Sequence, residues 1–229
     1  MKIQKTLLAL SIIVFIPFGI MIWIRNHQST GFASIELIQY PLIFGGGSIV
    51  VLYFLKKYFL KEELKDFNSG EGSWGRDISW GLLLTLIYFV LFYIERATLT
   101  NWLTFVPNME MLDLMLSLRE SPLLLLLWFG PVLWIGIALY EELIRVFMLT
   151  SLWRFSDSEL WAFTVMLITS ILIGLTHWSQ GSYGMVTIAL KSLVACFFFY
   201  RYRRLLPLVI AHVLYDGLQV ALLLITYPQ

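Results

Sequence analysis

Long apolar stretches separated by short polar segments dominate the hydrophobic pattern of the chain. A helix that crosses a membrane needs about 20 mostly apolar residues, and stretches of about this length recur along the sequence. The pattern therefore predicts an all-α fold, a polytopic transmembrane helical bundle of about seven spans. The predicted spans are residues 6–24, 36–55, 78–95, 122–153, 159–178, 184–201 and 205–226.

The polar segments between the predicted spans are small. Residues 56–77 contain the tract NSGEGSWG, and residues 97–121 contain MEMLDLMLSL, which suits a short amphipathic helix along the membrane interface. We see no internal repeat, no low-complexity tail and no separable soluble domain. We therefore expect a single membrane domain, in which residues 1–120 supply N-terminal helices and loops and residues 121–229 supply the core helices.

Composition agrees with a membrane protein. Hydrophobic residues make up 59% of the 229 residues and charged residues only 14%, and the mean hydropathy is +0.79, outside the range of soluble domains. The basic residues form short clusters near span ends rather than one patch, so we expect the lipid bilayer as a partner and no nucleic acid. The single cysteine, Cys196, provides neither a disulfide framework nor a zinc-binding cysteine pattern.

The basic residues near the span ends predict the orientation of the chain, because lysine and arginine are enriched in cytoplasmic loops. Most of them fall on one side if the N-terminus is cytoplasmic, and only single arginines fall on the other side. We expect this orientation in a plasma membrane, and the compact size suggests a bacterial source. The residues that share the cytoplasmic side are Lys2, Lys5, Lys56, Lys57, Lys61, Lys65, Arg154, Arg201, Arg203 and Arg204.

Ionisable residues are few within the last four predicted spans, where each is costly unless it is paired or functional. Arg145 lies four residues after Glu141 and three after Glu142, so it can reach either carboxylate. One partner leaves the other glutamate uncompensated, which favours a general base over a purely structural ion pair. The complete set is Glu141, Glu142, Arg145, His177, Lys191, His212 and Asp216.

The two histidines of this set lie on different spans. His177 stands in GLTHWSQG, at the end of a span and close to Gly181, which can interrupt the helix. His212 and Asp216 are four residues apart, so the carboxylate can hydrogen-bond the ring and fix its tautomer and orientation. The alternatives are a hydrogen-bonded interface histidine at 177 and a self-satisfied polar pair at 212 and 216.

These residue types allow glutamate-based hydrolysis or a metal site. The helical zinc motif H-E-x-x-H is absent, so we expect no metal. An aspartyl protease needs two aspartates within the spans, and only Asp216 qualifies, while Ser182 in QGSYG is misplaced for a serine nucleophile. Lys191 can extend to the interface, lose its charge or pair with a site carboxylate, and the sequence does not decide among these.

Three short motifs carry a family resemblance: EELIR at 141–145, IGLTH at 173–177 and HVLYD at 212–216. They resemble the E-E-x-x-x-R, F-x-x-x-H and H-x-x-x-N/D motifs of the CPBP family, the CAAX proteases and bacteriocin-processing enzymes also called Abi proteins. Active members of that family are polytopic membrane glutamic proteases. The resemblance covers roughly residues 120–220.

The resemblance implies a role for each motif. In the family the first glutamate and the second-motif histidine activate a water, and the third-motif pair supports the oxyanion. An ionised aspartate is a poor oxyanion donor, so we expect Asp216 to orient His212 and leave donation to the histidine. The residues that take these roles here are Glu141 and His177 for the water, His212 and Asp216 for the oxyanion, and Glu142 and Arg145 as supporting residues.

Two positions depart from the family motifs. Ile173 replaces the usual phenylalanine, which changes packing more than chemistry. The arginine comes one residue early, so Arg145 is expected nearest Glu141 in angle, whereas in the family it lies nearest the second glutamate. We prefer the alignment that keeps the glutamate pair intact; aligned on the arginine, Tyr140 would occupy the catalytic position and the protein would be an inactive relative.

The sequence thus predicts an intramembrane glutamic endopeptidase that needs no metal or cofactor and cleaves a membrane-associated or hydrophobic peptide. A non-catalytic scaffold that binds a membrane partner is the alternative, and a transporter is less favoured because no repeat or paired broken helices are evident. Straight helices would hold Glu141, His177 and His212 at different depths. Convergence therefore requires tilt, a break at residues 130–131 or a re-entrant segment near Gly181.

Overall fold

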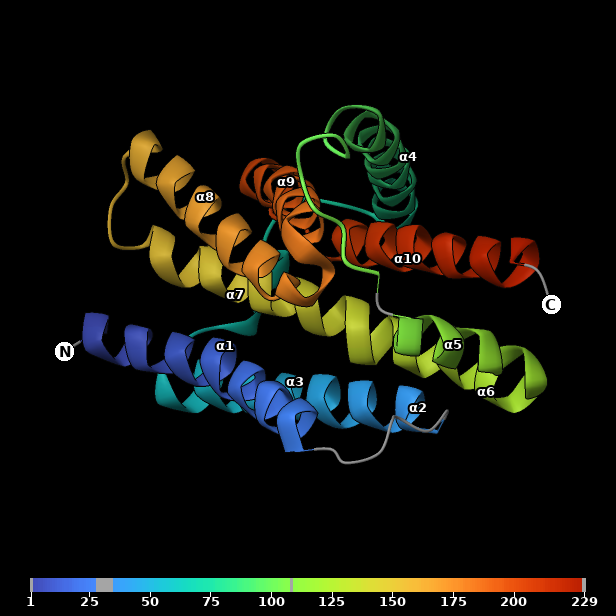
Figure 1. Ribbon diagram of the computed structural model, residues 1–229. Helices are drawn as coiled ribbons and strands as arrows, with labels where there is room; N and C mark the ends of the chain where they lie inside the picture. Colours follow the sequence, from blue (N-terminus) through green and yellow to red (C-terminus); the bar gives the residue numbers. More distant parts are fainter. Residues whose placement is uncertain (1, 28–34, 108, 228–229) are drawn as a thin grey trace.

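A computed structural model describes residues 2–27, 35–107 and 109–227, and within these ranges the fold is all-α, with no strand (Figure 1). Each predicted span coincides with a helix or with a continuous run of helical segments. The bounds are α1 Lys2–His27, α2 Glu36–Pro41, η1 Leu42–Gly46, α3 Gly47–Phe54, η2 Leu55–Phe59, η3 Leu64–Asn68, α4 Trp74–Thr98, α5 Met109–Ser117, η4 Leu118–Glu120, α6 Pro122–Leu127, η5 Trp128–Leu139, α7 Tyr140–Trp153, α8 Glu159–Leu175, η6 Trp178–Gln180, α9 Gly181–Tyr202 and α10 Leu206–Thr226.

The lengths of these helices refine the prediction of seven spans. Two of the predicted spans correspond to apolar helical stretches of fewer than 18 residues, Ile3–Pro17 and Glu159–Leu175. The protein is nevertheless an integral membrane protein, because five other stretches are long and apolar enough to cross a bilayer. Those five, among the described residues, are Glu36–Phe59, Trp74–Thr98, Pro122–Trp153, Trp178–Tyr202 and Leu206–Thr226. The cytoplasmic N-terminus stays a prediction.

Serine residues set the start of three helices. Ser73, Ser121 and Ser158 precede α4, α6 and α8, and the hydroxyl of each accepts a hydrogen bond from the backbone N–H three residues later. These bonds satisfy N–H groups that have no partner in the first turn of a helix. Pro122 follows Ser121 at a position where its fixed φ suits the helix and its missing N–H costs nothing.

The long stretch from α6 to α7 is interrupted at Gly130, one of the three ways in which the site residues were expected from the sequence to converge. Gly130 has non-helical dihedrals, φ −87° and ψ −111°. The cause is local, because Pro131 disfavours the helical conformation of the residue before it and has no N–H to continue the ladder. After the break, η5 and α7 continue through the middle of the molecule, while α6 lies beside α5 at one end (Figure 1).

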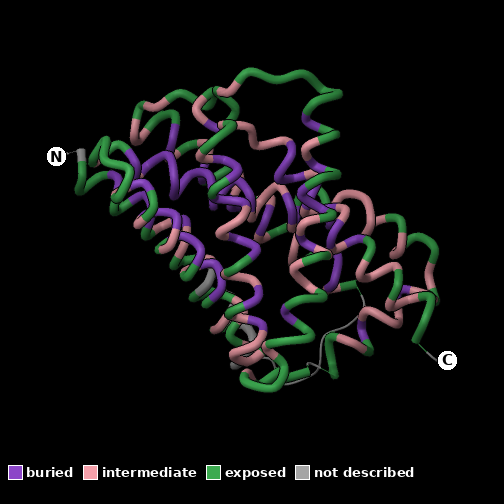
Figure 2. Tube along the Cα trace, turned by 90° about the horizontal axis from the view of Figure 1, so that it is seen from above, coloured by how far each residue is buried: buried purple, intermediate pink, exposed green. Residues whose placement is uncertain are grey.

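Helix α7 forms the centre of the bundle. Every residue from Glu142 to Ser151 is buried, because α1, α3, α8 and α9 all pack against this helix. Figure 2 shows that buried positions gather inside the molecule and that exposed positions line its outside. Many exposed side chains are large and apolar, including Leu126, Leu160 and Ile225, which is the surface expected where helices face lipid tails.

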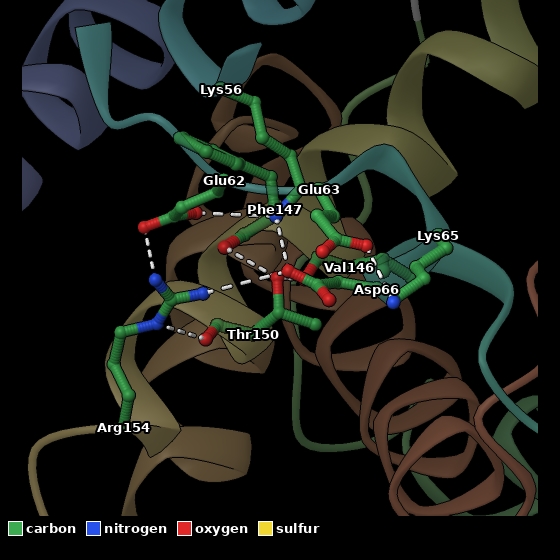
Figure 3. Close-up of polar contacts among 9 residues, drawn as sticks. All are labelled: Lys56, Glu62, Glu63, Lys65, Asp66, Val146, Phe147, Thr150 and Arg154. Atoms are coloured by element: carbon green, nitrogen blue, oxygen red, sulfur yellow. Dashed lines mark hydrogen bonds and ion pairs between the residues drawn. The ribbon is translucent and has the colours of Figure 1, made fainter.

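A charged cluster joins the segment after η2 to the end of α7 (Figure 3). Lys56 is fully buried, and its Nζ donates to Glu62 Oε2 at 3.2 Å and to Asp66 Oδ2 at 3.0 Å. Arg154 pairs with Glu62 and donates from Nε to the carbonyl oxygen of Thr150 at 3.1 Å. Two cations and two carboxylates thus balance one another, and they fix this loop against the central helix.

Two helices approach closely where Gly45 of η1 meets Gly136 of η5. A Cβ atom added to Gly45 would lie 2.3 Å from the carbonyl oxygen of Gly136.

We expect Gly45→Ala to lower the free energy of unfolding by about 1–3 kcal/mol, because the two backbones must move apart. Thermal unfolding in detergent, followed by tryptophan fluorescence, measures the change. Gly46→Ala is the control, since a Cβ there meets nothing within 4 Å; equal melting temperatures for the two variants would contradict the prediction.

Candidate active site

Glu142, on the first turn of α7, is the most enclosed of the predicted site residues. Its side chain is 3% exposed, and both carboxylate oxygens have partners. Oε2 pairs with the guanidinium of Arg145, and Oε1 lies 2.9 Å from Nδ1 of His212 on α10. Arg145 in turn donates from Nε to the hydroxyl of Ser192 on α9 at 3.1 Å. One buried carboxylate therefore connects α7, α9 and α10.

The partner of Arg145 differs from the prediction. From the positions around the helix, the guanidinium was expected nearest Glu141, but in the structure it pairs with Glu142. Both glutamates are within reach of a residue three or four positions later, so burial decides between them. Glu142 is enclosed and needs a cation to offset its desolvation, whereas the side chain of Glu141 is 30% exposed. The arginine thus pairs with the second glutamate, as it does in the CPBP motif.

His212 is surrounded by acidic side chains. Its Nε2 lies 3.2 Å from Asp216 Oδ2 and 3.9 Å from Glu141 Oε2, while its Nδ1 faces Glu142. The predicted contact between His212 and Asp216 is confirmed, and it holds the ring from the Nε2 side. The carboxylates of Glu141 and Asp216 are each about one-third exposed, with side-chain exposures of 30% and 34%. This edge of the cluster is therefore the part that is open to the surroundings of the protein.

No metal arrangement is found in this part of the molecule. Within the described residues, no group of three or more histidine, cysteine, aspartate and glutamate side chains has an arrangement suited to a metal ion. The cluster instead forms a continuous set of hydrogen bonds and ion pairs, which brings together five of the six predicted site residues. They are Glu141, Glu142, Arg145, His212 and Asp216.

His177, the sixth predicted residue, lies just beyond the C-terminal end of α8. Its Nδ1 is 3.1 Å from the carbonyl oxygen of Ile173 and 3.1 Å from the hydroxyl of Thr176. Among the described residues, it shares no hydrogen bond or ion pair with Glu141 or His212. The structure therefore places His177 at a helix end, as the sequence suggested, without joining it to the acidic cluster.

The corner between α8 and α9 is held by the segment that follows α4. Val106 N donates to Gln180 O at 3.2 Å, and Tyr183 N donates to Thr104 O at 3.0 Å. Gly181 stands at this corner with φ +77°, where a Cβ would lie 2.4 Å from Thr104 O. Only glycine adopts this conformation and this approach without strain. The predicted interruption near Gly181 is thus a sharp corner that fixes the segment next to His177.

The sequence reasoning missed two contributors to the buried network. Ser192 carries no motif that would have marked it, yet its hydroxyl accepts from Arg145. Glu95, near the end of α4, is 2% exposed and pairs with Lys191 of α9. Lys191 thus pairs with a carboxylate, although not with one of the predicted site, and its Nζ also donates to Thr187 O at 3.4 Å. Glu95 was overlooked because it lies outside the last four spans.

One protein-family model matches the part of the chain that contains this cluster. The model described as "Rce1-like: Type II CAAX prenyl endopeptidase Rce1-like" matches residues 123–218. This segment is less than half of the 229 residues, and it is similar to the Rce1-like family. The resemblance to the CPBP family is thereby confirmed, and all three motifs lie within the matched segment. No curated protein and no solved structure shows significant similarity to the chain.

The Rce1-like segment corresponds closely to one part of the fold. It begins in α6, ends within α10 and contains the acidic cluster together with Ser192 and Lys191. Glu95 lies outside it, on α4, which packs along α10. By its description, the matched family is one of endopeptidases, which hydrolyse peptide bonds.

The pair of Lys191 and Glu95 gives a direct test of the buried network. We expect Lys191→Met to lower the free energy of unfolding by about 3–5 kcal/mol, because it leaves a buried carboxylate without its cation. The double variant Lys191→Met with Glu95→Met removes both charges and should recover most of this loss. Denaturant unfolding in detergent measures all three proteins. A double variant no more stable than Lys191→Met would show that the carboxylate was not the cause.

Proposed function

We propose that this protein is an intramembrane glutamic endopeptidase that needs no metal and cleaves a membrane-associated or hydrophobic peptide. The observation that supports this best is the unequal surroundings of two adjacent glutamates. Glu142 is buried and bonded to Arg145 and His212, so its carboxylate is committed to the structure. Glu141 has an exposed carboxylate edge 3.9 Å from His212 Nε2. A base must reach both water and substrate, and Glu141 meets that requirement.

The proposed reaction begins with a water bound at Glu141. Glu141 accepts a proton from this water while the water oxygen forms a bond to the carbonyl carbon of the substrate, and the carbonyl oxygen becomes an oxyanion. The proton then passes from Glu141 to the amide nitrogen as the C–N bond breaks. The products are a carboxylic acid and an amine, with Glu141 restored as the base.

His212 supplies the charge that offsets the oxyanion in this scheme. Carboxylates accept hydrogen bonds, so with Glu142 and Asp216 ionised both ring nitrogens donate, and the imidazole is positively charged. Glu142 fixes the ring from the Nδ1 side and Asp216 fixes it from the Nε2 side. A developing oxyanion beside Nε2 then shares this donor with Asp216 and meets a fixed positive charge.

His177 is proposed as the second group that binds the water. A carbonyl oxygen only accepts, so the contact of Nδ1 with Ile173 O indicates that Nδ1 carries the proton. The Nε2 atom of His177 then has the lone pair that a water-binding group needs. Because no direct contact joins His177 to Glu141, the bound water or substrate would bridge the two groups.

The pairing of Arg145 supports the alignment that keeps Glu141 in the catalytic position. In the alternative alignment Tyr140 would be catalytic and Glu141 would be the glutamate paired with the arginine. The partner of Arg145 is Glu142, and Tyr140 hydrogen-bonds Ser48 on α3. Tyr140 therefore has a contact of its own with the neighbouring helix, while Glu141 is the residue that lies beside His212.

We expect Glu141→Gln to reduce cleavage at least 100-fold, because the amide cannot take the proton from water. Purified protein in detergent is tested on fluorogenic hydrophobic peptides and on prenylated peptides ending in a CAAX sequence, with and without a metal chelator. Glu159→Gln is the control, an exposed glutamate in the first turn of α8.

Full cleavage by Glu141→Gln, or loss of wild-type cleavage in chelator, would contradict the mechanism. If the wild-type protein cleaves none of these peptides, the result favours the scaffold over the protease, because a scaffold has no cleavage activity.

Asp216 can act in two ways: it can orient the His212 ring, or it can supply a negative charge. We expect Asp216→Asn to keep substantial activity, because the amide oxygen can still accept from His212 Nε2, and Asp216→Ala to lose most of it. Values of kcat and KM for both variants on the same peptide give the comparison. Equal and complete loss in both would mean that the negative charge itself is essential.

A further inference from the structure

A basic pocket lies where α9 ends and α4 and α10 begin, apart from the acidic cluster. It is a depression of about 360 Å³ between the loop before α4 and the α9–α10 turn. None of its residues belongs to the three catalytic motifs. The charged residues that line it are Glu71, Arg76, Asp77, Arg201, Arg203 and Arg204.

Only one of the four arginines is neutralised by a carboxylate. Arg204 donates from Nε to Asp77 Oδ1 at 3.0 Å and pairs a second time with the same carboxylate, which raises the pKa of Arg204. Arg76 donates to the backbone oxygen of Glu71 at 2.7 Å and makes no ion pair among the described residues. The lining thus includes three arginines without a carboxylate partner among the described residues and one further carboxylate, that of Glu71, so the pocket carries a net positive charge.

Arg203 lines the pocket at the end of α9, but its guanidinium packs against aromatic rings. Its backbone has φ 54°, and its guanidinium lies 4.2 Å from the centroid of the Trp153 ring. Within the described part of the chain this arginine has no carboxylate partner, and burial lowers the pKa of Arg203. Trp153 and Tyr200, the rings that its guanidinium contacts, do not line the pocket, so we assign the anion-binding charge to Arg76 and Arg201.

The walls of the pocket are fixed by backbone contacts, so the pocket exists before a ligand binds. Gly70 N donates to Arg203 O at 3.0 Å, and Leu205 N donates to Asn68 Oδ1 at 3.2 Å. A Cβ on Gly70 would lie 1.8 Å from Tyr202 O, which shows how closely the loop approaches the end of α9. Such a fixed arrangement lowers the cost of ordering the site on binding.

The surroundings of the pocket indicate a lipid rather than a soluble ligand. The pocket lies at the ends of three membrane-spanning stretches. The rings of Trp80 and Tyr202 also line it, with centroids 4.7 Å apart, and such aromatic rings gather at the headgroup level of membranes. In the predicted orientation this end faces the cytoplasmic leaflet, which carries anionic lipids.

We propose that this pocket binds the phosphate group of an anionic phospholipid. The free arginines would contact the phosphate oxygens, and the acyl chains would extend along the aromatic and apolar surface of α4 and α9. Guanidinium groups suit phosphate because they donate two parallel hydrogen bonds. The site is separate from the acidic cluster and does not depend on the proposed protease activity.

Native mass spectrometry of the full chain in a neutral detergent tests this proposal with phosphatidylglycerol and phosphatidylcholine. We expect the wild-type protein to retain phosphatidylglycerol preferentially, and the variant Arg76→Gln with Arg201→Gln to bind it roughly tenfold more weakly. Both arginines are exposed, so the variant should keep its melting temperature without lipid. The matched control is Arg96→Gln with Lys65→Gln, which removes two exposed positive charges outside the pocket.

Melting temperatures measured with inorganic phosphate distinguish a lipid headgroup from a soluble phosphate compound as the ligand. In one outcome, phosphate raises the melting temperature of the wild type but not of the pocket variant, while neither lipid is preferred. That result would overturn the lipid as ligand and indicate a soluble phosphate compound instead. Equal retention of the two lipids with no effect of phosphate would overturn the proposal. An equal loss of lipid binding in the control and pocket variants would overturn it as well.

Discussion

The buried carboxylate of Glu142 requires a cation or a hydrogen-bond donor at each oxygen. The positions of the other site residues depend on which groups supply these contacts. A charge inside an apolar bundle is strongly destabilising unless it is paired and hydrogen-bonded. Arg145 comes from the same helix and His212 from α10, and Arg145 also contacts Ser192 on α9. The pairing of one residue thus fixes the relative positions of three helices.

This arrangement also explains why two adjacent glutamates differ. Neighbouring residues on a helix point about 100° apart, so Glu142 faces the centre of the bundle while Glu141 faces the edge near Asp216. Arg145 and His212 Nδ1 are taken by Glu142, and Glu141 is left with a longer contact to Nε2 and 30% exposure. The difference arises from geometry, since the two side chains are chemically identical.

The sequence predicted the relations that depend on nearby residues. Apolar stretches marked the helices, Gly130 before Pro131 marked the break, and the four-residue spacing marked the contact of His212 with Asp216. It failed where packing chooses between equivalent partners: Arg145 could reach either glutamate, and only tertiary burial selects Glu142. The pair of Glu95 and Lys191 joins residues 96 positions apart, a contact that no local pattern could indicate.

The same physical criterion supports both the proposed catalytic residue and the proposed lipid pocket. Lys56, Lys191 and Arg204 are cations that meet carboxylates of this chain, so their interactions are complete within the protein. Glu141 and Arg203 differ, because each is partly buried and lacks an ion pair of comparable closeness among the described residues. A partly buried charge without a close ion pair in the protein can bind a group that comes from outside the chain. We propose a water and a peptide as that group for Glu141, and an anion at the membrane surface for the unpaired arginines of the pocket.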